Sequence, residues 1–481
     1  MIRKAVCAIN NNDFLMEGEQ NSSFSSPSED FSLEDFLSDV DITDYAQDDA
    51  PRAVQEAPPP AKEKKQKAPK KKRPYRGMRI LAVLLSVILF CESLYCVFVF
   101  SDISFCVDLR RMFIDTALET MSHRWLADYT MPAYQVAERE ALKTQLAMQQ
   151  HGQNSERPDP LQPSGSGTDT PEDPSSGDNV IGGLTPGVDL DEEAFYKLFW
   201  ELSRSSFEAY LDTHPEALAD GWNNIYINEA GLHDDGTSIY TTMGEQVLAI
   251  DVPNKILLIR VSGSGYQGVL AVAKDPSQLR CEASSGIGSY GQQLDTIVEN
   301  SGGVLGMNAS GFYDPNGNGN GGKLAGYAMC KGAEYGTHYT LYGYKRIELT
   351  EDNRFYITDS DMSVASDVTD AVEFSPSLIV DGEMTDWYIW TANNPRACIG
   401  QSETGEILML VIEGRMVGRS IGTDVETCAN ILKRHKAYTA MNLDGGTTAV
   451  MYYRGEYVTM CSNTDIVSRL LPNAWVYGNY E

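Results

Sequence analysis

A predominantly apolar run from Ile80 to Phe100 constrains the architecture of this 481-residue chain more than any other feature. About 20 apolar residues make a helix long enough to cross a bilayer. The segment before the run, residues 57–79, is rich in lysine and arginine, whereas Asp102 and Asp108 follow it. Because positive charge collects on the cytoplasmic side of such helices, we expect residues 80–101 to be an uncleaved signal anchor in the cell membrane. The N-terminus would be cytoplasmic and the C-terminal part extracellular.

Residues 1–79 are expected to form a cytoplasmic tail that is acidic at first and ends in the polybasic segment. This composition offers little apolar surface to bury, so disorder is the expectation. Acidic and apolar residues alternate over residues 32–45, which is also typical of a short helix that binds a cytoplasmic partner. The formal net charge of −30 argues against nucleic acid as the main partner of the chain.

Four further segments follow the anchor. Helical periodicity over 102–150 predicts a helical stalk, and residues 151–188 are rich in Pro, Ser, Gly and Asp, which is typical of a flexible linker. Residues 189–221 read as an amphipathic helix. Residues 222–481 consist mostly of apolar strand patterns interleaved with two helical patterns, so we expect a mixed α/β (α+β) domain. No C-x-x-C spacing is present among the nine cysteines, which argues against a zinc ribbon.

One polar turn near the C-terminus has the composition of a ligand site. Residues 440–452 read as a strand, a tight turn and a second strand, and Asp444 lies where the first strand stops. Two glycines that can expose backbone N–H groups come next, followed by two hydroxyls: Gly445, Gly446, Thr447 and Thr448. An acid, bare donors and hydroxyls together suit an anion or a sugar. An ordinary Asp-Gly hairpin is the alternative.

A second turn, over residues 306–314, has a similar design. A predicted strand delivers Asn308 to small residues that include Ser310, and Asp314 follows. A core turn packed by aromatic residues is the alternative. Asp314, Asn316 and Asn318 also place oxygen ligands at alternating positions, as in the first half of a calcium loop. Ala325 replaces the closing glutamate of an EF-hand, so a partial calcium site and a glycine-rich flap are the two remaining interpretations.

Four motifs in this part of the chain resemble, in the same order, those of the phosphodiester glycosidase family. Residues 308–314 resemble Asn-Gly-Gly-Phe-Phe-Asp, and residues 395–400 resemble Pro-Arg-Thr-Ala-Ile-Gly. Residues 413–415 resemble Asp-Gly-Arg, with Glu413 in place of the aspartate. Residues 442–448 resemble Asn-Leu-Asp-Gly-Gly-Gly-Ser, with Thr447 in place of the third glycine. The resemblance spans roughly residues 222–481.

The resemblance implies hydrolysis of a sugar-1-phosphodiester. Asp444, with Glu413 or Asp314 as its partner, would activate water or stabilise the oxocarbenium ion. Arg396 and Arg415 would neutralise the phosphate. The remaining polar groups would bind the sugar or the phosphate: Asn308, Ser310, Asn442, Gly445, Gly446, Thr447 and Thr448. For an extracellular enzyme the expected substrate is an envelope glycopolymer or exopolysaccharide.

Three other functions fit the sequence. The glycine-to-threonine change at Thr447 is compatible with a module that binds such a glycopolymer without cleaving it. A metal-dependent phosphodiesterase would need histidine clusters, but the chain has 6 histidines and none beside the motifs. A scaffold acting through residues 1–61 is the third. The enzymatic interpretation requires Arg396 and Asp444 to face one cavity.

Overall fold

The computed structural model describes residues 76–120, 124–157, 190–339, 344–386, 391–478 and 480. Nearly all of the predicted tail and most of the predicted linker, residues 158–188, therefore lie outside the described residues. The described residues combine helices with antiparallel sheets, as the sequence predicts for its C-terminal part.

The apolar run forms one long helix, α2 (Arg76–Phe100). Residues 77–100 are long and apolar enough to cross a membrane, and the helix presents its large apolar side chains outward along most of its length. Arg110 donates to the carbonyl oxygens of Phe98 and Ser101 at the end of α2, at 2.9 and 3.3 Å. Such donors satisfy the last carbonyls of a helix, which have no partner within it.

Three helices occupy the region of the predicted helical stalk: α3 (Ser104–Glu119), α4 (Arg124–Thr130) and α5 (Ala133–Gln150). They pack on one another through an apolar cluster that includes Ile114 and Val136. They do not form an isolated stalk, because Asp115 accepts a 2.6 Å hydrogen bond from Thr391, far along the chain. Gln150 likewise donates to the carbonyl oxygen of Asp386 at 2.5 Å.

The chain segment after α5 also differs from the prediction. Residues 151–157 fall in the predicted linker, but they lie along the edge strand β10 (Phe355–Asp359). Ser155 exchanges two hydrogen bonds with the backbone of Ile357, at 2.8 and 2.9 Å. Periodicity cannot reveal such pairing, because a single extended segment carries no information about its partner.

Nine strands form the largest sheet, in the order β1-β2-β3-β4-β15-β14-β16-β12-β13, and every neighbouring pair is antiparallel. Its strands are β1 (Tyr226–Asn228), β2 (Gln246–Asp251), β3 (Ile256–Gly263), β4 (Tyr266–Ala273), β12 (Ser377–Val380), β13 (Glu383–Met384), β14 (Arg396–Ser402), β15 (Ile407–Ile412) and β16 (Ala437–Asn442).

Two five-stranded sheets complete the β structure. One has the order β10-β9-β11-β7-β8, with β7 (Tyr327–Cys330), β8 (Ala333–Gly336), β9 (Lys345–Thr350) and β11 (Val368–Phe374). The other has the order β18-β17-β6-β19-β5, with β5 (Leu279–Ala283), β6 (Gly303–Asn308), β17 (Met451–Tyr453), β18 (Glu456–Tyr457) and β19 (Asn473–Gly478).

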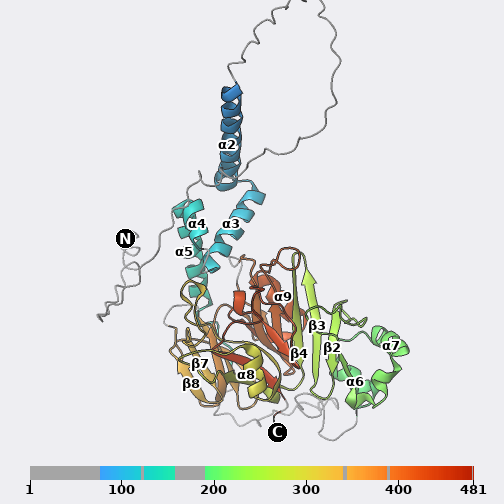
Figure 1. Ribbon diagram of the computed structural model, residues 1–481. Helices are drawn as coiled ribbons and strands as arrows, with labels where there is room; N and C mark the ends of the chain where they lie inside the picture. The colour runs from blue at the N-terminus through green and yellow to red at the C-terminus, as the bar shows by residue number, and fades with distance from the viewer. Residues whose placement is uncertain are drawn as a thin grey trace, which may run out of the picture. The chain divides into compact units, whose positions relative to one another are not determined.

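Both faces of the large sheet are buried, which explains its continuous apolar strands. Successive residues of β15 alternate between two cores: Met409 packs with the two smaller sheets, and Leu410 packs with the helices. The helices on that second face are α6 (Glu192–Leu198), α7 (Arg204–Thr213) and α9 (Val425–Arg434). Figure 1 shows α6 and α7 beside β2. The helix α8 (Leu294–Asn300) covers the sheet of β6 and β19.

Single-turn 3₁₀ helices occupy several connections: Pro215–Leu218, Trp222–Asn224, Pro276–Gln278, Pro315–Gly317 and Gly446–Thr448. The last two belong to the predicted site segments. The helix α9 begins directly after Asp424, whose carboxylate accepts from the backbone N–H of Thr427 at 2.8 Å and so caps the helix.

Candidate functional site

The predicted site segments converge on a cavity of about 820 Å³. In the antiparallel register, Arg396 at the start of β14 pairs with Ile412 at the end of β15, and Cys398 pairs with Asn442 at the end of β16. The start of one strand and the ends of its two neighbours therefore lie at the same sheet edge. The lining residues used below come from there and from three other segments: Glu119, Thr120, Asp314, Asn394, Arg396, Arg415, Asn442, Asp444 and Arg469.

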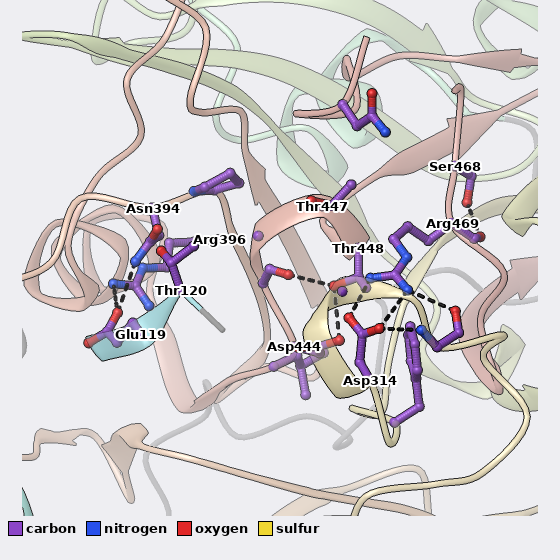
Figure 2. Close-up of a pocket in the computed structure, with 18 of the residues that line it drawn as sticks. Glu119, Thr120, Asp314, Asn394, Arg396, Asp444, Thr447, Thr448, Ser468 and Arg469 are labelled. Carbon is purple, nitrogen blue, oxygen red and sulfur yellow. Dashed lines mark hydrogen bonds and ion pairs between the residues drawn. The ribbon is translucent and has the colours of Figure 1, made fainter. Parts of the chain in front are cut away.

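Asp444 is the carboxyl group at the centre of this site (Figure 2). Its Oδ2 accepts a hydrogen bond from Thr448 Oγ1 at 3.0 Å, and its backbone oxygen accepts from Asn308 Nδ2 at 2.6 Å. Burial raises the pKa of Asp444 to about 7, the bond from Thr448 and the charge of Arg469 oppose this rise, and the nearby charge of Asp314 adds to it. The group therefore titrates in the range where a carboxyl group can exchange protons with a reactant.

The two glycines after Asp444 let the turn pack against the loop that precedes β14. A Cβ atom at Gly445 would lie 2.6 Å from the Pro395 carbonyl oxygen, and the Gly446 N–H donates to that oxygen at 3.0 Å. Gly446 has a φ of 66°, which favours glycine. The sequence predicts that its N–H binds substrate, but within the protein this N–H has Pro395 as its partner.

Two arginines lie on one side of the cavity. Arg396 is 6% exposed, and its Nε and Nη2 donate to the Thr423 and Ala392 carbonyl oxygens and to Glu119. Three of its five N–H groups are thus engaged, so a two-nitrogen clamp on phosphate is not available in this arrangement. Arg415 donates through Nη2 to Asn394 Oδ1 at 3.1 Å and to Thr120 Oγ1 at 3.4 Å.

Arg469 and Asp314 form an ion pair on the other side (Figure 2). Arg469 donates to both carboxylate oxygens, at 2.5 and 2.9 Å, and this pairing lowers the pKa of Asp314 although partial burial opposes the shift. A calcium ion at Asp314 would have to displace the guanidinium. Asn318 also lines the cavity, whereas the side chain of Asn316 is outside the described part of the chain. Calcium binding here stays a prediction.

Asn442 and the two threonines after the glycines line the cavity as predicted. The Asn442 amide donates to the Ser375 carbonyl oxygen at 2.8 Å. Thr447 Oγ1 accepts from Ser462 Oγ at 3.2 Å, and Thr448 Oγ1 holds Asp444.

The structure does not bring three predicted site residues to this cavity. Both oxygens of Glu413 accept from Arg419, at 2.6 and 2.9 Å, and Glu413 lines a separate cavity of about 330 Å³. Asn308 is completely buried and holds the backbone around Asp444. Ser310 is buried against Asn473, to which its N–H donates at 3.0 Å. All three contact other parts of the protein around the motifs, and their roles in catalysis or substrate binding stay predictions.

Several cavity residues are not identified by sequence reasoning: Glu119, Thr120, Tyr344, Asn394, Ser468 and Arg469. Glu119 and Thr120 fall in the predicted stalk, which has no visible link to the motifs. Arg469 does carry a usable signal, because it is the only lysine or arginine after Arg454.

The cavity holds a carboxyl group with a pKa of about 7 beside arginine side chains. Hydrolysis of a phosphorylated sugar requires groups of these two kinds. Residues 301–477 match the family model described as phosphodiester glycosidase. The match confirms the resemblance indicated by the motifs and suggests glycosidase activity on phosphodiester linkages. It is shorter than the predicted span, since β1 to β5 precede it.

Two solved structures are similar to this chain at low identity. The zebrafish N-acetylglucosamine-1-phosphodiester alpha-N-acetylglucosaminidase catalytic domain, auto-inhibited by pro-peptide, is 13% identical with a TM-score of 0.39, and the match covers 58% of this chain and 95% of that chain. A hypothetical protein from Synechocystis is 15% identical with a TM-score of 0.34, and the match covers 48% of this chain and 63% of that chain. A comparison with curated proteins found no match.

Proposed function

We propose that this protein is a membrane-anchored extracellular glycosidase that hydrolyses a sugar-1-phosphodiester, of the N-acetylglucosamine-phosphate type, in an envelope glycopolymer or exopolysaccharide. The observation that carries the proposal is the shared cavity: Asp444, Arg396 and Arg415 all line it. Its volume is within the range of pockets that hold small ligands. The family match over residues 301–477 supports the type of linkage.

In the proposed reaction, the Asp444 carboxylate removes a proton from a water molecule that attacks the anomeric carbon. The bond between that carbon and the phosphate oxygen breaks, and the electron pair leaves with the phosphate. The products are the free sugar and a phosphate monoester. The departing phosphate is stable as an anion, so strong help from a general acid is less necessary than for an ordinary glycoside. The arginines stabilise its developing charge.

Product analysis tests the reaction. Purified full-length protein is incubated with the methyl diester of N-acetylglucosamine-1-phosphate in ¹⁸O-labelled water. We expect free N-acetylglucosamine that carries the label, together with unlabelled methyl phosphate. Label in the phosphate would instead show cleavage of the P–O bond by a phosphodiesterase. Binding of the diester without turnover would favour the non-catalytic module.

Membrane anchoring rests on α2. We expect the full chain to stay with membranes after alkaline washing, and a chain that begins at residue 102 to be released. If added protease removed the tail of intact cells and spared the C-terminal part, the proposed orientation would be wrong.

A further inference from the structure

The end of helix α3 reaches the candidate active site from outside the family-matched region. Glu119 and Thr120 line the same cavity as Asp444, although they precede the matched residues by about 180 positions. The Glu119 side chain is 14% exposed. Desolvation would raise the pKa of this carboxyl group, but the charges of Arg396 and Lys143 outweigh it and the pKa is lowered. Glu119 is therefore a carboxylate held within the site.

Glu119 is connected to both arginines, and Figure 2 shows it beside Arg396 and Asn394. Its Oε1 accepts from Lys143 of α5 at 2.8 Å. Its Oε2 accepts from Arg396 Nη2 at 2.9 Å and from Asn394 Nδ2 at 3.0 Å. The Asn394 amide is thereby oriented with its oxygen toward Arg415, from which it accepts at 3.1 Å. One carboxylate thus fixes Arg396 directly and Arg415 through Asn394.

Among the described residues, a carboxylate neutralises the charge of one of the two arginines but not that of the other. Arg396 forms an ion pair with Glu119, whereas Arg415 donates to a hydroxyl and an amide oxygen, which are neutral. Within the residues that the structure describes, no carboxylate pairs with Arg415. Arg415 is exposed, although partial burial of its guanidinium and the charge of Arg396 lower its pKa. An accessible cation that has only neutral partners is free to pair with an anionic ligand.

We propose that Glu119 is a positioning residue of this site. It neutralises Arg396 and orients Asn394, so that Arg415 is the cation that binds the phosphate of the substrate. The membrane-proximal helices α3 and α5 are then part of the active site. The assignment of a phosphate ligand rests on the proposed function.

The test uses the full chain in detergent, with two readouts: calorimetric binding of inorganic phosphate and turnover of the methyl diester of N-acetylglucosamine-1-phosphate. We expect Arg415→Gln to weaken phosphate binding at least tenfold. Glu119→Gln should tighten phosphate binding about threefold or more, because Arg396 is no longer neutralised, yet lower kcat at least tenfold, because phosphate is then shared between two arginines. Asp108→Asn is the matched control, since Asp108 lies on the exposed side of α3.

A double variant separates positioning from folding. Arg396→Gln alone leaves Glu119 paired with Lys143 but not with Arg396, and this less compensated carboxylate should weaken phosphate binding at least tenfold. Glu119→Gln combined with Arg396→Gln removes both charges of the pair and keeps a polar side chain at each position, so phosphate affinity should return to within threefold of the parent. If Glu119 had only a structural role, Glu119→Gln and Arg396→Gln would each lower Tm, and the double variant would have the lowest Tm.

Three results would overturn the inference. The first is unchanged kinetics and phosphate binding in Glu119→Gln, and the second is an equal loss of phosphate affinity for Arg396→Gln and Arg415→Gln, whether or not Glu119→Gln is also present. The third is a rise in both phosphate affinity and kcat in Glu119→Gln. The last would identify Glu119 as an inhibitor that competes with the substrate. The phosphate-binding measurements do not depend on turnover. If the parent cleaves no diester but the binding pattern is as expected, the proposed function fails and the roles of Glu119 and Arg415 stand.

Discussion

At the residue scale, Asp444 shows how burial changes what a carboxyl group can do. Its pKa rises from 3.8 to about 7, mainly through desolvation. The folded protein therefore binds a proton there between these two pH values and the unfolded chain does not. Ionisation of Asp444 costs stability as the pH rises through this window. The same shift gives a base that is half ionised at neutral pH.

We expect Asp444→Asn to reduce kcat by about 10²–10⁴-fold and to stabilise the fold. The stabilisation should be absent near pH 4, where the carboxyl group is neutral in the folded state. It should reach roughly 1–3 kcal/mol at pH 8, where the substitution removes the buried negative charge that the parent carries. Thermal unfolding at the two pH values measures it. A destabilised variant at pH 8 would contradict the account.

The Asp314–Arg469 pair should tune this titration. With Asp444 as the base, kcat/KM should rise with pH and have its midpoint near the pKa of about 7. Arg469→Gln removes a cation and exposes the charge of Asp314, so the midpoint should move upward by about one unit. Asp314→Asn with Arg469→Gln removes both charges and should return it toward the parent value. The charged groups facing Asp444 in this comparison also include Arg415. A midpoint that does not move would exclude electrostatic coupling.

At the element scale, the turn after β16 contacts two other loops of the site, the one that holds Pro395 and the one that holds Arg415. Gly446 has a positive φ, and a Cβ atom there would lie 3.3 Å from both terminal nitrogens of Arg415. The turn therefore sets the position of the guanidinium as well as that of Asp444. Strand β16 delivers the turn to the cavity only because its register with β14 is fixed by a buried apolar face.

Gly446→Ala should therefore impair phosphate recognition as well as stability. Gly455→Ala is the matched control, because Gly455 has a φ of 94° and a Cβ atom added there would have no other atom within 4 Å. We expect each variant to lose about 1 kcal/mol of stability. KM should rise several-fold only in Gly446→Ala, where Arg415 must move. Equal KM values in the two variants would show that the turn tolerates the methyl group.

At the scale of the whole molecule, the site is assembled from residues 119–470. Deleting residues 1–75 should leave kcat and KM of the full chain within about twofold, since the lining residues lie beyond the deletion. Turnover of the methyl diester by the two proteins in the same detergent measures this. A large loss would mean that the tail contributes to the site.

Much of this architecture can be predicted from local pattern. The apolar run, the mixed helix and sheet content and the start of α9 at Asp424 follow from periodicity and capping. The sequence also groups the segments around Asp444 and Arg396 in one site, and both line the same cavity. The helices, strands and turns depend on residues that are close together in the chain, so they can be predicted from the sequence.

The tertiary structure alone decided which side chains meet. Glu413 follows β15 directly, yet it turns to Arg419 and a separate cavity, while Arg415, two residues on, lines the site. Glu119, in a segment predicted to stand apart, contacts Arg396 instead. By itself, the sequence determined the apolar helix, the strands and the polar turns. Register, side-chain direction and desolvation determined the partners and the pKa of Asp444, because these depend on contacts between segments distant in the chain.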